Sequence, residues 1–218
     1  MLSVLPGVAP ALGRELERAG LAANPQVPDD AEELALTVPA TPAALGVLAG
    51  LRTAVAAHAV LTSPAPRPTG LLATEVTRAF ADVLALVARQ RPRVRFTALR
   101  LEAAGSHTPQ MQRLASELAA VAGLEVDPDD GDLLVRVRRA SHGPGWEALV
   151  RTTPRPLATR AWRTERYPGA LNATIAAAVV DELGVGESDR FADVMCGSGT
   201  IVIERLARGG AGRCSPST

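Results

Sequence analysis

The stretch FADVMCGSGTIVIE, residues 191–204, limits how this chain can fold more than any other part of the sequence. A short apolar run leads into two glycines, and a run with helical apolar spacing follows. Glycine permits a tight turn and lets a ligand approach the backbone without a Cβ atom in the way. We therefore expect a strand at 191–195, a turn at 197–199 and a helix at 200–207, an arrangement that α/β proteins use to hold nucleotide-like ligands.

Three ligand classes use such a turn, and the neighbouring residues separate them. A phosphate-binding P-loop needs Lys and then Ser or Thr after its last glycine, whereas Thr200 and Ile201 follow here. A dinucleotide fingerprint needs a small residue where this chain has Val202. The third class has an acid four residues before the first glycine, and Asp193 occupies that position. Such an acid can accept hydrogen bonds from a positively charged cofactor, and a cofactor without phosphate needs no lysine.

The string DVMCGSGT resembles the D-P-x-C-G-S-G-T turn of class I S-adenosylmethionine-dependent RNA methyltransferases that carry a THUMP domain and act on guanine N2. Val194 stands where that family usually has proline. The string YPGALNATIAAAVV resembles the family's helix before the first strand, and RPLATRAWR, residues 155–163, resembles its interdomain linker. Residues 99–107 and 123–137 resemble THUMP segments, and MLSVLPGVAPALGREL resembles the family's N-terminal ferredoxin-like module.

This resemblance implies an α+β fold with several parts. They are a ferredoxin-like module at 1–64, a THUMP RNA-binding domain at 65–154, a linker and the beginning of a Rossmann-like methyltransferase domain at 155–207, and an irregular tail at 208–218. The implied reaction moves a methyl group from S-adenosylmethionine to guanine N2 of tRNA or rRNA, in the cytoplasm, and we expect a monomer. The implied cofactor contacts are Leu171, Asn172, Thr174, Asp193, Cys196, Gly197, Ser198, Gly199 and Thr200. The implied RNA contacts are Arg100, Ser106, His107, Arg155, Arg160 and Arg163.

The family's catalytic tetrapeptide, Asn/Asp-Pro-Pro-Tyr/Phe, holds the flipped target base, and no such string occurs in this sequence. Residues 207–218, ARGGAGRCSPST, contain no apolar run, so we expect no second strand there for the cofactor ribose. The expectation is an incomplete and inactive methyltransferase fragment, produced by a break in the reading frame or an artificial end, with residues from 165 onward loosely held. The alternative is an RNA-binding THUMP module without catalytic activity. An unrelated α/β enzyme has only the turn in its favour.

All basic residues are arginines, and the 23 basic and 23 acidic residues balance. Any attraction to a partner must therefore be local. Arginines 89, 91, 93, 95 and 100 follow one another without an acid, and arginines 151, 155, 160, 163 and 166 lie beside one glutamate. If the clusters share a face, they form a phosphate-binding stripe. The alternative is an ordinary solvated surface in an arginine-rich protein.

Other site chemistries have little support. Two cysteines without a signal peptide indicate a reducing compartment. Cys196 is as well explained as a small buried apolar residue, because methyl transfer to nitrogen needs no thiol. No histidine and cysteine spacing suggests a metal site. The sequence therefore predicts no metal and assigns no catalytic residue.

The rest of the chain alternates between helical and strand patterns. Residues 63–70, SPAPRPTG, are expected to be a linker, with Thr69 capping the next helix. Gly20, Gly123 and Gly184 are placed to end helices. Helices are expected at residues 10–19, 42–49, 71–88, 109–122, 170–183 and 200–207, and strands at 1–5, 33–38, 53–61, 94–101, 133–137, 146–150 and 191–195.

Overall fold

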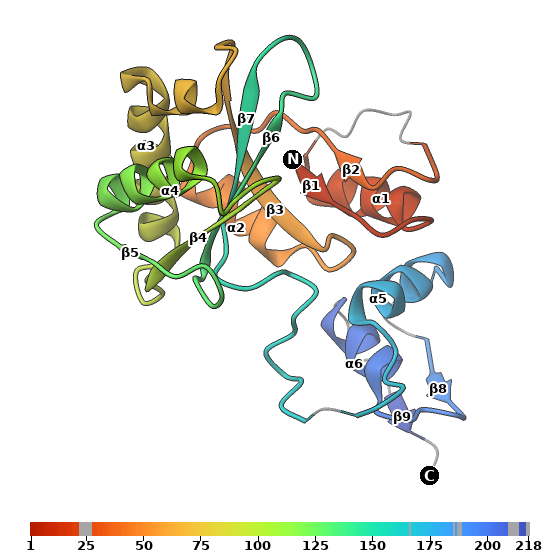
Figure 1. The fold of residues 1–218 in the computed structure, drawn as a ribbon. Helices are drawn as coiled ribbons and strands as arrows, with labels where there is room; N and C mark the ends of the chain where they lie inside the picture. Colours follow the sequence, from red (N-terminus) through yellow and green to blue (C-terminus); the bar gives the residue numbers. More distant parts are fainter. Residues whose placement is uncertain (22–27, 166, 185, 187–188, 209–213, 217–218) are drawn as a thin grey trace. The chain divides into compact units, whose positions relative to one another are not determined.

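The computed structural model describes residues 1–21, 28–165, 167–184, 186, 189–208 and 214–216 (Figure 1). The chain divides into two compact units. Unit one contains Met1, residues 37–49 and residues 57–155, and unit two contains residues 2–36, 50–56 and 156–218. Residues 1–64, which the sequence suggested as one module, therefore contribute to both units.

Unit one is a mixed sheet with helices packed against it. Its strands follow one another in the order β3-β7-β6-β4-β5. The β3–β7 and β6–β7 pairs are antiparallel, whereas β4 runs parallel to both β5 and β6. The strands are β3 (Ala56–Ser63), β4 (Ala98–Ala103), β5 (Glu125–Val126), β6 (Leu133–Arg139) and β7 (Trp146–Arg151). The helices are α2 (Pro42–Gly50), the 3-10 helix η1 (Pro68–Leu72), α3 (Thr74–Gln90) and α4 (Pro109–Ala122).

Helix α4 has the bounds that the sequence predicts. Pro109 occupies its first turn, where a missing N–H costs nothing, and Gly123 ends it in the left-handed region at φ 68°. Leu114 and Leu118 are buried against the sheet, in a core that also includes Phe80 of α3. The regular spacing of apolar residues therefore predicted both the bounds of α4 and its buried face.

Strand β4 begins four residues later than the alternating sequence pattern predicts. Pro92 has no N–H to donate to a sheet. The amide of Val94 donates to the carbonyl of Arg91 at 3.0 Å, which makes a turn. The amides of Thr97 and Ala98 donate to Asp132 Oδ1 at 2.8 and 3.2 Å. A side-chain carboxylate thus takes the hydrogen bonds just before the strand, and residues 91–97 remain outside the sheet.

Unit two combines residues near the beginning of the chain, residues 50–56 and residues from 156 onward. Strands β1 and β2 pair antiparallel. Strands β8 and β9 pair parallel, and α6 lies between them in the sequence. Helix α1 contacts α5, and α5 packs on α6. The elements are β1 (Leu2–Ser3), α1 (Ala9–Arg18), β2 (Glu33–Leu34), α5 (Ala173–Glu182), β8 (Phe191–Asp193), α6 (Thr200–Ala207) and β9 (Cys214–Pro216).

Strand β9 corrects the expectation that residues 207–218 contain no second strand; residues 209–213 and 217–218 of the expected irregular tail lie outside the described residues. Cys214 lies opposite Phe191 in the register, and Pro216 lies opposite Asp193. Parallel neighbours need a crossover connection, and α6 supplies it. A three-residue strand without an apolar run is too short to give a periodic signal in the sequence.

Among the described residues, no helix has the length and apolar character needed to cross a membrane.

Candidate functional site

The glycine turn joins β8 to α6, as the sequence predicts. Gly197 has φ 50° and Gly199 has φ 70°, in the left-handed region that favours glycine. The amide of Gly199 donates to the carbonyl of Cys196 at 2.7 Å, which closes the turn. A Cβ atom added at either glycine would meet no heavy atom within 4 Å. The backbone of the turn therefore borders open space, where a ligand could lie against it.

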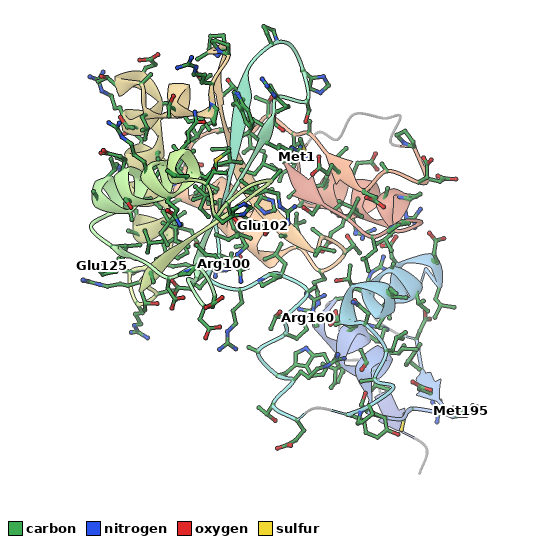
Figure 2. The ribbon with its side chains drawn as sticks, viewed as in Figure 1. Met1, Arg100, Glu102, Glu125, Arg160 and Met195 are labelled. Carbon is green, nitrogen blue, oxygen red and sulfur yellow. The ribbon has the colours of Figure 1, made fainter. Side chains whose placement is uncertain are left out.

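Polar side chains surround this turn. Asp193 ends β8, and its Oδ1 accepts a hydrogen bond from the amide of Met195 at 3.1 Å. A carboxylate has further acceptor positions, so this contact leaves Asp193 able to bind a ligand. The hydroxyls of Ser198 and Thr200 lie 3.0 Å apart. Strand β8 ends at Asp193, so Val194 and Met195, which were expected in the strand, instead begin the turn. The side chain of Met195 is 89% exposed (Figure 2).

The beginning of α5 supplies the second group of predicted cofactor contacts. Asn172 caps the helix, and its side-chain oxygen accepts from the amide of Thr174 at 2.8 Å. Leu171 is partly exposed, but Thr174 is 0% exposed, and no described residue pairs with its Oγ1. The structure therefore does not place the side chain of Thr174 where a cofactor could touch it.

Arg163 brings the two groups together. Its Nη2 donates to the carbonyl of Leu171 at 2.8 Å and to Thr200 Oγ1 at 3.0 Å. The beginnings of α5 and α6 are thereby held side by side. The sequence assigned Arg163 to RNA, whereas this guanidinium contacts the proposed cofactor turn.

Glu204 anchors α6 one turn after its first residue. Its buried carboxylate accepts from Arg160 Nε at 2.9 Å and from Arg52 Nε at 2.6 Å. Arg160 also donates to the carbonyls of Leu157 and Arg52. This arginine is buried and fully engaged, so the RNA contact predicted for it is not supported by its position.

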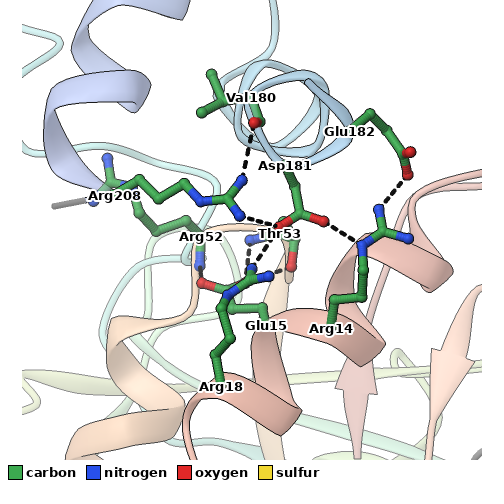
Figure 3. A network of polar contacts seen from close by, with 9 residues as sticks. All are labelled: Arg14, Glu15, Arg18, Arg52, Thr53, Val180, Asp181, Glu182 and Arg208. Carbon is green, nitrogen blue, oxygen red and sulfur yellow. Dashed lines mark hydrogen bonds and ion pairs between the residues drawn. The ribbon is translucent and has the colours of Figure 1, made fainter. Parts of the chain in front are cut away.

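A second buried acid, Asp181, lies near the end of α5 (Figure 3). Its carboxylate receives Arg14 Nε and Arg18 Nη2, each at 2.5 Å, and Arg208 Nη2 at 3.1 Å. Hydrogen bonds to Asp181 and to Glu182 raise the pKa of Arg14 above its ordinary value. The ion pairs attach α1 to the helices that flank the glycine turn.

The sequence interpretation did not predict the buried ion pairs of Glu204 and Asp181, although the sequence contains a signal for them. Glu204 interrupts the apolar run IVIERL, and Asp181 follows the apolar run AAAVV. An acid on the buried face of a helix needs a cation, because an unpaired buried charge is costly. The sequence alone does not indicate which arginines provide it.

The predicted RNA contacts are divided between the units. Arg100, Ser106, His107 and Arg155 belong to unit one, whereas Arg160 and Arg163 belong to unit two. Ser106, His107 and Arg155 are exposed, and Arg100 Nη1 donates to the carbonyl of Asp129 at 3.1 Å.

Of the remaining second-cluster arginines, Arg166 lies outside the described residues. Arg151 is buried, and burial lowers its pKa. Its guanidinium donates to the carbonyls of Thr153, Asp132 and Pro154 at 2.9, 3.1 and 2.6 Å. Arg151 therefore connects the end of β7 to the backbone of neighbouring segments within unit one. The described residues contain no group of His, Cys, Asp or Glu that could hold a metal ion.

Residues 160–210 match the model of the UPF0020 family, described as the RMKL-like methyltransferase domain. No curated protein sequence matches the chain. The fold is similar to that of a predicted N6-adenine-specific DNA methylase from Listeria monocytogenes, at 17% identity and a TM-score of 0.57, over 95% of this chain and 54% of that one. It is also similar to TrmN from Thermus thermophilus, at 22% identity and a TM-score of 0.55, over 99% and 63% of the respective chains.

A possible methylase from Clostridium difficile gives 20% identity and a TM-score of 0.55, over 95% of this chain and 54% of that one. This chain thus covers only 54% to 63% of the length of these three structures. It shares their fold, a mixed α/β architecture, and its segment 160–210 is similar to the RMKL-like methyltransferase domain.

Proposed function

We propose that this chain is part of a class I RNA methyltransferase that uses S-adenosylmethionine and modifies guanine N2 of tRNA or rRNA. One observation carries the proposal. Gly197 and Gly199 turn their backbone toward open space between an acid at the end of β8 and the beginning of α6. The match of residues 160–210 to a methyltransferase domain supports it.

The residues present fit such a cofactor. Gly197 and Gly199 permit close approach, and Asp193 offers a carboxylate to the hydrogen-bond donors and the positive charge of the cofactor. Ser198 and Thr200 offer hydroxyls, and Arg163 holds Thr200 in place. When bound, S-adenosylmethionine supplies a methyl group on a positively charged sulfur. The chain itself would bind and orient that group.

We also infer that residues 65–154 are a THUMP-type RNA-binding domain and that residues 1–64 include a ferredoxin-like module. The order η1/α3, β4, α4, β6 and β7, with the two-residue β5 between α4 and β6, supports the first inference. A monomer in the cytoplasm is part of the same proposal.

The alternative function is RNA binding without methyl transfer. It is favoured by one feature of the structure: Ser106, His107 and Arg155, three of the predicted RNA contacts, are exposed in unit one. Under this alternative, RNA binding would persist without any contact to the cofactor.

Saturation-transfer NMR with S-adenosylhomocysteine tests the cofactor site, because it detects weak binding. We expect transfer from the 218-residue chain to the ligand, and its loss in Gly199→Val. Gly143→Val is the matched control, since Gly143 also has positive φ, at 84°, and open space around its Cβ position, but lies in unit one. Absence of transfer to the unaltered chain, or equal loss in both variants, would refute the cofactor site.

A further inference from the structure

A cavity of about 540 Å³ opens at the end of α3 in unit one. Its walls come from the end of α3, the end of α4 and the segment 91–97. Leu84, Val87, Phe96 and Leu124 give the cavity apolar walls, and polar groups share the lining with them. The volume lies within the range of about 300–1,000 Å³ that is usual for small-molecule sites.

Arg91 and Arg95 line this cavity, and Arg89 and Arg93 lie within two residues of Arg91 in the sequence. Arg89, Arg93 and Arg95 are exposed, and Arg91 is half-buried. Within the described part of the chain, no hydrogen bond or ion pair engages the guanidinium groups of these four arginines.

Three other arginines of the same unit are paired with acids. Arg113 pairs with Glu117, Arg136 with Glu102 and Arg138 with Glu147. The nearby carboxylate of Asp132 is used by backbone amides, and Glu125 on the adjacent β5 is a single exposed acid. The patch formed by Arg89, Arg91, Arg93 and Arg95 therefore carries a local excess of positive charge.

The combination of a cavity with apolar walls on one part of its lining and free guanidinium groups on another fits one kind of ligand. Guanidinium forks suit phosphate oxygens, and they also stack on planar rings. A nucleobase is flat and largely apolar on its faces, and it can enter a cavity only when it is not paired in a duplex. A single-stranded nucleic acid can place a base in the cavity and its phosphates on the guanidinium groups at the same time.

We propose that this cavity and the patch of four arginines bind a single-stranded segment of RNA. One base occupies the cavity beside Phe96, and the neighbouring phosphates lie on Arg89, Arg91, Arg93 and Arg95. The proposal takes RNA as the substrate class from the proposed function, but the site lies in unit one, away from the glycine turn in the sequence.

The test is fluorescence anisotropy of the full chain with a labelled, unstructured 12-nucleotide RNA. Arg91→Gln with Arg95→Gln should weaken binding at least tenfold and reduce the slope of log K against log salt by about 1.4, at about 0.7 per lost phosphate contact on single strands. Arg113→Gln with Arg136→Gln is the control with the same change in charge, and it should alter affinity less than twofold.

A second variant separates the cavity from the charge. Ala88 is exposed and lines the cavity, so Ala88→Met fills space without adding an aromatic ring. We expect threefold to tenfold weaker binding with an unchanged salt slope. Thermal unfolding by circular dichroism should match the unaltered chain for all variants.

Three results would overturn the proposal. The first is an equal loss of RNA affinity in the control variant Arg113→Gln with Arg136→Gln, and the second is an unchanged RNA affinity in Ala88→Met. The third is that poly-glutamate or a fully paired RNA hairpin loses as much affinity as the single-stranded RNA when Arg91 and Arg95 are replaced. The same variants are tested for saturation transfer to S-adenosylhomocysteine. Loss of RNA binding with unchanged transfer supports the RNA site. If the unaltered chain shows no transfer but binds RNA through the patch, the proposed methyltransferase function fails and the RNA site stands.

Discussion

The guanidinium of Arg163 lies 3.0 Å from the hydroxyl of Thr200, and the same Nη2 atom lies 2.8 Å from the carbonyl of Leu171. One side chain from the segment before α5 thus fixes the beginnings of both helices beside the glycine turn. The position of the hydroxyl on α6 depends on a residue that does not itself belong to the turn.

Arg163→Gln should weaken the binding of S-adenosylhomocysteine severalfold, because Thr200 and the carbonyl of Leu171 lose their shared donor. Titration by NMR chemical shifts measures this change. Arg190→Gln removes an exposed arginine of the same unit and should leave the affinity unchanged. Arg163→Lys should restore part of the loss. If Arg190→Gln has the same effect, net charge rather than positioning is responsible.

Glu204→Gln should destabilise unit two by about 3–5 kcal/mol, because removing one partner of a buried ion pair leaves the other charge uncompensated. Arg160 and Arg52 both lose their carboxylate in this variant. Urea unfolding gives the free energy. Glu117→Gln, which breaks an exposed pair with Arg113, should cost less than about 1 kcal/mol. Similar losses in the two variants would show that Glu204 is no anchor.

Asp181→Asn should make the C-terminal segment sensitive to proteolysis. The side chain of Asp181 is 2% exposed, and three arginines converge on it. Limited proteolysis followed by mass spectrometry should show faster cleavage after residue 165 than in the unaltered chain. Asp189→Asn changes an exposed acid of the same unit and serves as the control. Rapid cleavage of the unaltered chain in this region would mean that the arginines around Asp181 do not secure it.

The stability of unit one should depend on pH through Glu147. Burial alone would raise the pKa of this carboxyl, but hydrogen bonds from Arg138 and Ser141 outweigh burial, and the pKa lies below its ordinary value of 4.5. A lowered folded-state pKa contributes stability above the unfolded value, and this contribution is lost as the pH falls through the folded value. Glu147→Gln should therefore be less stable than the unaltered chain at pH 7.

The difference between Glu147→Gln and the unaltered chain should shrink below pH 4.5. Unfolding midpoints measured from pH 3 to pH 7 follow this change. A constant difference across that range would mean that the pair of Glu147 with Arg138 does not set the pH dependence.

Sequence patterns predicted the regular elements better than the contacts of charged residues. Helices α4 and α6 have the expected bounds because Pro109, Gly123 and Gly199 mark their ends. Strands β5 and β9 were missed because two or three residues paired through the backbone leave no periodic signal. The burial of Arg160 was not foreseen, since a cluster of arginines in the sequence does not reveal which guanidinium is buried.

The division into units was equally hard to foresee. A sequence is read in order, and the predicted modules were contiguous. The structure instead joins residues 2–36 and 50–56 to residues 156–218, through ion pairs between side chains that are distant in the sequence. Hydrophobic periodicity indicates which face of a helix is buried, but not against which distant segment.

The ion pairs of Asp181 and Glu204 also set the order in which the chain can acquire its structure. Arg14, Arg18 and Arg52 leave the ribosome early, whereas their acidic partners are made more than 150 residues later. Domains generally fold as units during synthesis, and long-range contacts close slowly. Unit one is synthesised almost entirely in that interval. The ion pairs of Arg14 and Arg18 must therefore wait, with the surface around them still exposed, until Asp181 emerges.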